Sequence, residues 1–394
     1  MTDLKLDFST RAIHSGEIVP DPFGSLVPPV YITSTFCFDS VEDGAARFQD
    51  NQNGYFYSRI SNPTLSLLES RLANLEEAEA GLVTASGMGA ISATLWSLLA
   101  AGDHIVVDKT LYGCTYSFLK NALPKFGVEV SFVDFTNHTA VSKSLTSRTK
   151  AVFFESPTNP NMRVIDIERI SKLVHGYSSE IKVIVDNTYC SPVIQRPMSH
   201  GADLVVHSAT KYLGGHGDLL AGAVVGNKSL IDLIRLTGLK DMTGSVLAPL
   251  SAFLILRGLK TLHLRIKEHS RSAYEIAMRL EKHPAVQSVL YPGLSSNPFL
   301  RLAKKQMDCF GGVIAFELKG DKSNAIQFLN NLRLIKRAVS LGDAESLCQH
   351  PASMTHSTYS AVELQKHDIS DKLIRLSVGL EATDDIYKDI LNAL

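Results

Sequence analysis

The chain has 394 residues, a length that predicts about two domains, each large enough for its own core. Its 39 Lys and Arg residues balance 40 Asp and Glu residues, which gives no general attraction for nucleic acid or an anionic membrane, so we expect a small-molecule partner. Five scattered cysteines without a CxxC pair, and no apolar run of membrane-spanning length or signal-like N-terminal segment, predict a soluble cytoplasmic protein.

The first 60 residues are rich in Pro, Gly, Asn and aromatic residues and show little sustained periodicity. Residues 24–40 and 50–64 are typical of irregular structure, because Pro and Gly interrupt both helices and strands. We therefore predict that residues 1–60 form an extended N-terminal arm that docks on another surface.

Residues 61–248 are predicted to form a large α/β domain. Short apolar runs alternate here with amphipathic segments such as 166–174, in which Ile167, Ile170 and Val174 share one face. Near-continuous apolar runs are typical of strands buried on both faces, so we predict a mostly parallel sheet with helices on both sides. The predicted strands are residues 104–108, 128–135, 150–155, 182–186, 203–207 and 221–226.

Residues 249–394 are predicted to form a smaller α+β domain. A long helical pattern begins at Pro249 and is expected to bend near Gly258, where glycine weakens the helix. Strand-like runs over 311–320 and 373–381 follow, with a helix between them and another at the end of the chain.

Polar side chains gather where the predicted strands of the large domain end. In open α/β sheets, ligands bind beyond the carboxyl ends of the strands, so these positions favour a site. Taken singly, an Asp or Asn after a strand is more often a turn or cap residue. The residues at these ends are Glu155, Asn159, Asp186, Ser208, Thr210 and Lys211.

Residues 86–89, with the sequence Ser-Gly-Met-Gly, lie between a short strand-like run and a helical pattern. Free backbone N–H groups and the helix dipole at such a start favour phosphate binding. The segment matches neither GxGxxG nor GxxxxGK[ST], which weakens a dinucleotide or P-loop interpretation. Two alternatives stay open: a helix start whose glycines serve only packing, and a phosphate- or nucleotide-binding protein without catalysis.

Lys211 has small residues and glycines as neighbours instead of charged partners. Pyridoxal phosphate needs an amine for its imine, an acid beside its ring nitrogen, an aromatic stacking partner and phosphate donors. Lys211, Asp186, Tyr112 and the 86–89 loop with Ser208 and Thr210 supply these groups. The alternative for Lys211 is an ordinary phosphate-binding or surface lysine.

A metal site is the third possibility, because several histidines stand near one another in the sequence. None of the pairs has the i, i+4 spacing of a zinc-binding helix, so hydrogen-bonded structural histidines are the favoured interpretation and we expect no metal. The residues concerned are His207, His216, His350 and His356.

Residues 208–226, SATKYLGGHGDLLAGAVVG, resemble the lysine signature of the cysteine and methionine metabolism family of pyridoxal-phosphate enzymes. Other segments resemble this family in the same order along nearly the whole chain. They are YSRISNPT, ASGMGAI, TLYGCT, ESPTNP, VDNTY, VSLGDAESLCQHPASMTH and IRLSVGLE.

The resemblance implies a fold-type I pyridoxal-phosphate enzyme and a role for each matched residue. Lys211 would form the Schiff base, Asp186 would pair with the pyridine nitrogen, and Tyr112 would stack on the ring and help transfer protons. Asn159 would lie near the phenolic oxygen of the cofactor. The implied phosphate ligands within the chain are Gly87, Met88, Ser208 and Thr210.

The resemblance also implies a shared site and a substrate clamp. Tyr57 and Arg59 would reach the phosphate of a neighbouring subunit, which makes the active unit at least a dimer, commonly a tetramer. Arg375 would bind the α-carboxylate of an amino-acid substrate through its planar, permanently charged guanidinium. Ser340 would help position that carboxylate and the lysine.

Two positions favour one of the reactions known in this family. Cys114 and Val339 stand where cystathionine-processing members have glycine and glutamate, and both resemble the members that release methanethiol from methionine, as does the segment with Lys240 and Asp241. Valine offers apolar contact to a methylthio group, and Cys114 would pack against the substrate sulfur. A cystathionine γ-lyase or a homoserine-dependent γ-synthase or sulfhydrylase is the alternative, and the sequence does not fix the substrate.

Overall fold

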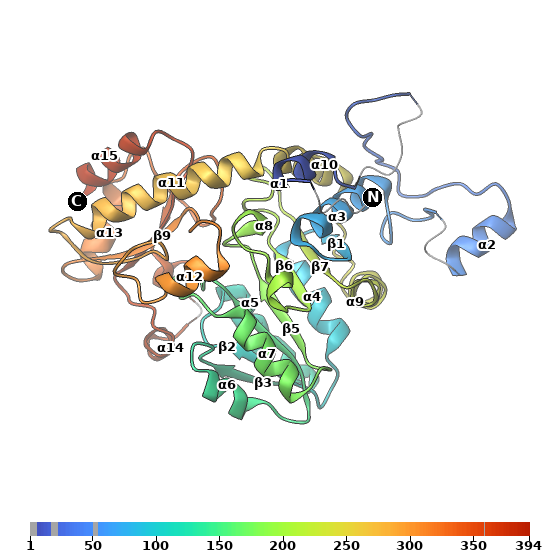
Figure 1. Ribbon diagram of the computed structural model, residues 1–394, viewed down its shortest axis with the longest axis horizontal. Coiled ribbons are helices and arrows are strands. Elements are labelled where there is room, and N and C mark those ends of the chain that lie inside the picture. The colour runs from blue at the N-terminus through green and yellow to red at the C-terminus, as the bar shows by residue number, and fades with distance from the viewer. Residues whose placement is uncertain (1–5, 17–22, 50–53, 358) are drawn as a thin grey trace.

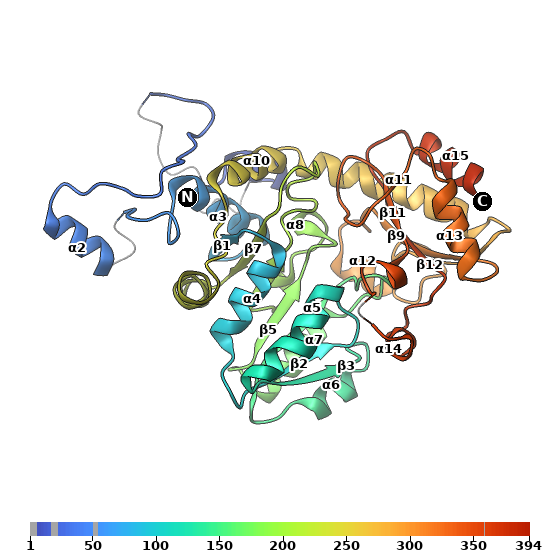
Figure 2. The same cartoon turned by 180° about the vertical axis from the view of Figure 1, so that it is seen from behind.

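The computed structural model describes residues 6–16, 23–49, 54–357 and 359–394, and Figures 1 and 2 show it from opposite sides. The part of the N-terminal arm within these ranges contains two short helices, α1 (Phe8–His14) and α2 (Val41–Gln49), which the sequence pattern did not predict. Helix α1 packs on the body, where Arg11 Nη1 donates to the Asn74 carbonyl at 2.6 Å. Helix α2 projects away from the body in both views.

A seven-stranded sheet with the order β1-β7-β6-β5-β4-β2-β3 forms the centre of the large domain. β2 to β6 are parallel, and β7 runs antiparallel to both of its neighbours, which confirms a mostly parallel sheet. The strands are β1 (Ala80–Thr84), β2 (His104–Asp108), β3 (Glu129–Val133), β4 (Thr149–Glu155), β5 (Lys182–Asp186), β6 (Leu204–His207) and β7 (Gly222–Gly226).

Both faces of this sheet are buried because adjacent apolar residues of a strand point to opposite sides. On β4, Phe153 packs in the cluster on one face and Phe154 in the cluster on the other, both at most 1% exposed. The helices around the sheet are α3 (Pro63–Glu76), α4 (Gly87–Leu98), α5 (Gly113–Ser117), α6 (His138–Ser144), α7 (Ile167–Tyr177), α8 (Ser191–Ile194) and α9 (Lys228–Leu233), with π-helical turns over Phe118–Ala122 and Ile234–Thr243.

The predicted bend near Gly258 is a break between α10 (Pro249–Leu259) and α11 (Leu262–Glu281). A side chain at Gly258 would bring a Cβ within 2.4 Å of the Gly214 carbonyl oxygen, so glycine is required where α10 crosses the chain that follows Lys211. This contact places the start of the C-terminal part directly against the lysine segment.

A five-stranded sheet with the order β10-β11-β12-β9-β8 forms the C-terminal part. β10 and β11 are parallel and the other pairs are antiparallel. The elements are β8 (Val286–Leu290), β9 (Val313–Leu318), β10 (Lys336–Arg337), β11 (Leu347–Gln349), β12 (Leu373–Ser377), α12 (Leu300–Gln306), α13 (Lys322–Asn331), α14 (Ala361–Lys366) and α15 (Thr383–Ala393). The boundaries after residues 60 and 248 stay a prediction. No helix within the described ranges has the length and apolar character to cross a membrane.

Candidate active site

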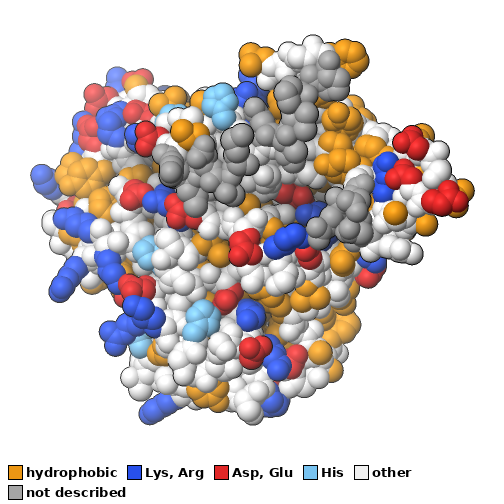
Figure 3. Space-filling model, turned by 45° about the vertical axis from the view of Figure 1, so that its right-hand side comes forward, with side chains coloured by type: hydrophobic (Ala, Val, Ile, Leu, Met, Phe, Trp, Pro, Cys, Tyr) orange, Lys and Arg blue, Asp and Glu red, His pale blue; other side chains and the backbone are white. Residues whose placement is uncertain are grey.

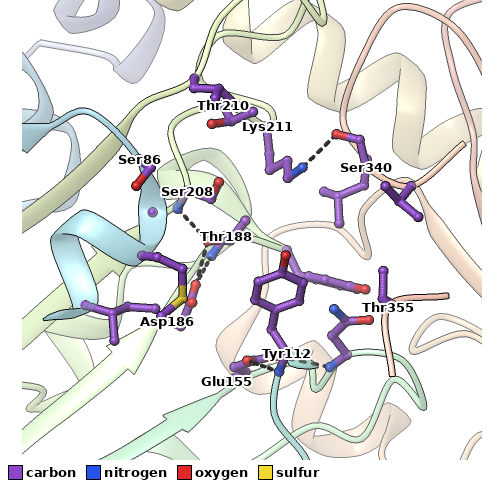
Figure 4. Close-up of a pocket in the computed structure, with 18 of the residues that line it drawn as sticks. Ser86, Tyr112, Glu155, Asp186, Thr188, Ser208, Thr210, Lys211, Ser340 and Thr355 are labelled. Atoms are coloured by element: carbon purple, nitrogen blue, oxygen red, sulfur yellow. Dashed lines mark hydrogen bonds between the residues drawn. The ribbon is translucent and has the colours of Figure 1, made fainter. Parts of the chain in front are cut away.

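A cavity of about 240 Å³ lies where the carboxyl ends of β4, β5 and β6 meet the C-terminal part (Figure 4). A cavity is thus present at the strand ends where the sequence predicted a site. Of the residues predicted from the sequence, the cavity is lined by Gly87, Met88, Tyr112, Asn159, Asp186, Ser208, Thr210, Lys211, Val339, Ser340 and Arg375.

Lys211 lies in the turn that follows β6, where its N–H donates to the Ser208 carbonyl at 3.1 Å. Its Nζ points into the cavity and donates to Ser340 Oγ at 2.7 Å. Burial, together with the nearby Arg375 guanidinium, lowers the pKa of Lys211. A lowered pKa enlarges the fraction of neutral amine at a given pH, and the neutral amine is the nucleophile and base.

Ser340 holds this amine from the opposite side of the cavity. Its backbone has φ 140°, a strained conformation for a residue other than glycine. Its carbonyl accepts from Arg375 Nη2 at 2.6 Å while its hydroxyl accepts from Lys211. The strained turn therefore joins the amine to the guanidinium in one hydrogen-bonded chain.

Asp186 ends β5, and one of its oxygens accepts two hydrogen bonds from Thr188, at 3.0 Å from N–H and 2.5 Å from the hydroxyl. Burial raises the pKa of Asp186, and these hydrogen bonds oppose the rise. A cationic ring nitrogen against this carboxyl would favour its charged form, because an opposite charge within a few ångströms lowers a carboxyl pKa. Asp186 thus fits a partner that is a protonated pyridine.

The start of α4 and Ser208 form a close-fitting concave surface. Ser86 caps the helix by accepting from Gly89 N–H at 3.0 Å, and the N–H groups of Gly87 and Met88 come before the first intrahelical hydrogen bond. A Cβ at Gly87 would lie 2.9 Å from Ser208 Cβ, so glycine allows this close approach. Backbone donors, a helix dipole and the Ser208 hydroxyl suit a phosphate.

Tyr112 precedes α5 and presents a partly exposed ring to the cavity. Cys114 Sγ donates to its hydroxyl oxygen at 3.4 Å, although Cys114 itself, which the sequence placed at the site, is not among the residues that line the cavity. Burial, followed by the interaction with Cys114, raises the pKa of Tyr112 well above its usual range. The phenol therefore keeps its proton throughout the neutral range, as a proton donor must.

Arg375, on β12, is 3% exposed and faces the cavity. Its Nη1 donates to Asn159 Oδ1 at 3.2 Å and to Tyr189 Oη at 3.1 Å. These contacts hold the guanidinium plane in place, so it can present paired donors to a carboxylate.

Tyr57 and Arg59 do not line this cavity. They lie on a separate hollow beside residues 246–249, where Arg59 Nη1 donates to the Lys240 carbonyl at 2.8 Å. The Arg59 guanidinium lies over the Tyr57 ring, 5.5 Å from its centre. Within one chain, these side chains are apart from Lys211.

The structure adds lining residues to which sequence reasoning gave no role. Glu155 was recognised only as a polar strand end, and Thr188 follows Asp186 in the segment VDNTY. Leu220 and Thr355 carry no sequence signal, because an apolar residue and a threonine in a loop are common everywhere.

The histidines considered for a metal site are held by other partners. His207 Nε2 pairs with Glu76 Oε1 at 2.6 Å, and His350 contacts Ser353 Oγ and the Asp371 carbonyl, each at 2.7 Å. Among the residues that the structure describes, no group of three or more His, Cys, Asp or Glu side chains has an arrangement suited to a metal ion.

Comparison with known proteins gives concordant matches over nearly the whole chain. The family profile described as "Cys/Met metabolism PLP-dependent enzyme" matches residues 9–394. An L-methionine gamma-lyase of Pseudomonas putida is 55% identical over 98% of this chain and 97% of its own length. A Campylobacter jejuni structure that carries N'-pyridoxyl-lysine-5'-monophosphate superposes with a TM-score of 0.94 at 36% identity, over 98% of this chain and 99% of that chain. A cystathionine gamma-lyase of Lactobacillus plantarum complexed with L-serine has a TM-score of 0.91 and 40% identity, over 98% of both chains.

Proposed function

Because the chain belongs to the family of Cys/Met metabolism PLP-dependent enzymes, we propose that it is a carbon–sulfur lyase that converts L-methionine and water into methanethiol, 2-oxobutanoate and ammonia. The observation that carries this choice is the apolar part of the cavity wall, to which Val339, next to Ser340 in the sequence, and Leu220 contribute; these two residues are 54% and 69% exposed. A methylthio group suits this wall, whereas the distal ammonium of cystathionine would meet no carboxylate from Val339. The name of the Pseudomonas putida relative supports the same substrate.

The residues of the cavity fit pyridoxal phosphate. The helix start at Gly87 and Met88, with the Ser208 hydroxyl, would hold the phosphate, and Asp186 would hold the ring nitrogen. When bound, the cofactor supplies an electron-withdrawing ring that stabilises the negative charge left on the substrate carbon. Tyr112 would stack on that ring, and the amide of Asn159 would lie near its phenolic oxygen.

The proposed catalytic work is divided among three side chains. Arg375 binds the substrate carboxylate and so fixes the Cα–H bond beside the Lys211 amine. Lys211, whose pKa burial lowers, removes the α-proton and then a proton from Cβ, and the electron pair left at Cβ forms the Cβ–Cγ double bond as the carbon–sulfur bond breaks. Tyr112 donates a proton to the departing thiolate, and Cys114, which donates to the phenol oxygen, packs near the substrate sulfur.

A panel of single substrates tests this assignment. The purified protein is supplied in turn with methionine, cystathionine, homocysteine and an acylated homoserine, and methanethiol, cysteine, hydrogen sulfide and 2-oxobutanoate are quantified. We expect the highest kcat/KM with methionine. Val339→Glu should raise the ratio of kcat/KM for cystathionine to kcat/KM for methionine about tenfold, because it adds a carboxylate for the distal ammonium.

Val362→Glu, the same change at a valine of α14 that is 76% exposed, is the matched control and should leave the ratio unaltered. Much higher efficiency with cystathionine than with methionine in the parent protein would make it a cystathionine γ-lyase. Products that appear only with a homoserine ester and a thiol would indicate a γ-replacement enzyme.

We further propose a cytoplasmic homotetramer with active sites shared across a dimer. All five cysteines are free, as is usual in a reducing compartment. Apolar side chains are exposed on the arm and the adjoining face (Figure 3), among them Leu26 at 92% and Val41 at 84%. Tyr57 and Arg59 lie off the cavity of their own chain, which supports a role at a neighbour's site. Sedimentation velocity measures the mass, and a fully active monomer would contradict the shared site.

A further inference from the structure

Glu155 is a buried carboxyl at the carboxyl end of β4, and it lies beneath Tyr112 in Figure 4. It is 4% exposed. Oε1 accepts from the Tyr112 backbone N–H at 2.6 Å, and Oε2 accepts from the Asn159 backbone N–H at 3.3 Å. One side chain therefore joins two loops that carry cavity residues.

The Tyr112 contact anchors a helix start. Tyr112 is the N-cap residue of α5, and its own side chain makes no capping hydrogen bond because the phenol points into the cavity. The N–H groups at a helix start need acceptors from outside the helix, and for Tyr112 that acceptor comes from Glu155 on a different strand. The position of the phenol is thus tied to the rigid sheet.

The Asn159 contact extends the same anchor to the substrate clamp. Asn159 accepts from Arg375 Nη1 through Oδ1, so Asn159 links the Glu155 carboxyl to the guanidinium of Arg375. Fixing the backbone of Asn159 limits where that amide oxygen can lie.

Glu155 stands beside Asp186, because the two residues are register partners on β4 and β5 and point to the same face. Burial, and then the Asp186 charge, raises the pKa of Glu155 well above its usual range, against the effect of the two backbone N–H groups. When one carboxyl of such a pair carries the charge, the other favours its neutral form. A neutral Glu155 can still accept from the Tyr112 N–H, and it adds no second negative charge beside Asp186.

We propose that Glu155 is a positioning residue, which holds the Tyr112 phenol at the place where it donates its proton to the leaving group. This inference rests on the proposed function, in which Tyr112 is the acid. A purely structural role is the alternative, since a buried carboxyl with two donors also stabilises the loops it joins.

A double-mutant cycle separates the two roles. Glu155→Met keeps side-chain length but removes both acceptors, and we expect it to lower kcat for methionine about a hundredfold through a displaced phenol. Glu155→Gln retains one acceptor, and its kcat should stay within about fivefold of the parental kcat. In the Tyr112→Phe background, Glu155→Met should lower kcat less than about threefold, because the phenol proton that Glu155 positions is already missing.

Val152→Ala is the matched control, because it lies on the same strand, is fully buried and packs on the opposite face of the sheet. It should lower the midpoint of thermal unfolding as Glu155→Met does, yet retain kcat. The affinity of the cofactor-free protein for pyridoxal phosphate gives a readout apart from turnover, and Glu155→Met should lower it less than about tenfold, since phosphate and ring nitrogen keep their ligands.

Equal losses of kcat from Glu155→Met in both backgrounds would overturn the proposal, as would full activity of Glu155→Met. If that variant does not fold, Glu155→Asp serves in the same cycle, because it draws the carboxyl back from the Tyr112 N–H by one methylene. If the parent protein releases no methanethiol, the proposed substrate is wrong. The cycle is then run on whichever panel substrate it cleaves, and the inference about Glu155 is judged separately.

Discussion

Replacing Lys211 by Ala is expected to lower turnover about 10⁴-fold or more with every substrate of the panel, because it removes the nucleophile and the base together. Among the described residues that line the cavity, Lys211 is the one amine. Its hydrogen bond to Ser340 holds that amine in the cavity, next to the proposed substrate clamp at Arg375. Steady-state release of 2-oxobutanoate measures the loss, and the visible absorbance of the protein reports whether the cofactor is retained.

Two further measurements make the Lys211 result specific. Lys172→Ala removes an exposed lysine of α7 that pairs with Glu168, and it should leave turnover intact. Added methylamine, a small soluble amine, should restore part of the turnover of Lys211→Ala by occupying the vacated space. A variant that keeps more than about one per cent of parental turnover would exclude Lys211 as the catalytic base. A protein that only binds phosphate would keep its ligand affinity after this change.

Replacing Tyr112 by Phe is expected to lower kcat for methionine by about 10²- to 10³-fold while the affinity for the cofactor changes little. The ring and its stacking surface remain, and only the proton donor is removed. Because the pKa of Tyr112 lies above its usual range, the parental phenol stays protonated at neutral and mildly alkaline pH, so the loss should not vary across that range.

The leaving group distinguishes proton donation from a general disturbance of the site. S-substituted homocysteines whose departing thiols are more acidic need less help from an acid, so Tyr112→Phe should slow them less than it slows methionine. Tyr177→Phe removes the hydroxyl of a tyrosine that is 50% exposed and does not line the cavity, so this control should leave kcat unchanged. Equal turnover in Tyr112→Phe and the parent would remove Tyr112 from this role.

The large sheet was predictable because most of its strands are short apolar runs, and those at its centre are buried on both faces. Residues 104–108 and 182–186 were predicted with the bounds of β2 and β5, and 128–135 overran β3 by one residue at its start and two at its end. The antiparallel direction of β7 was not predictable, since the apolar pattern of a strand carries no direction. Helices α1 and α2 were missed because they are too short for a sustained period, and α1 depends on packing against α3.

The candidate site was only partly predictable from the residues themselves. Asp186 and Lys211 follow strands of one sheet, so the position of strand ends was enough to bring them together. Ser340 lies 129 positions after Lys211, and Arg375 belongs to the other sheet, so the resemblance to a family alone associated them with the lysine. The contact of Glu155 with a backbone N–H 43 positions away could be predicted neither from the strand ends nor from the resemblance to a family.

The chain 207–217, which carries Lys211, and the turn at Ser340 are connected to different sheets, and the hydrogen bond from Lys211 to Ser340 joins them. The amine and the carboxyl that are proposed to do the chemistry belong to the first sheet, whereas Val339 and Arg375, which are proposed to recognise the substrate, come with the second. Under this proposal the second sheet contributes to substrate choice without supplying the reactive amine. We therefore expect exchange of the Val339 segment to change the preferred sulfur amino acid while the lysine and Asp186 stay as they are.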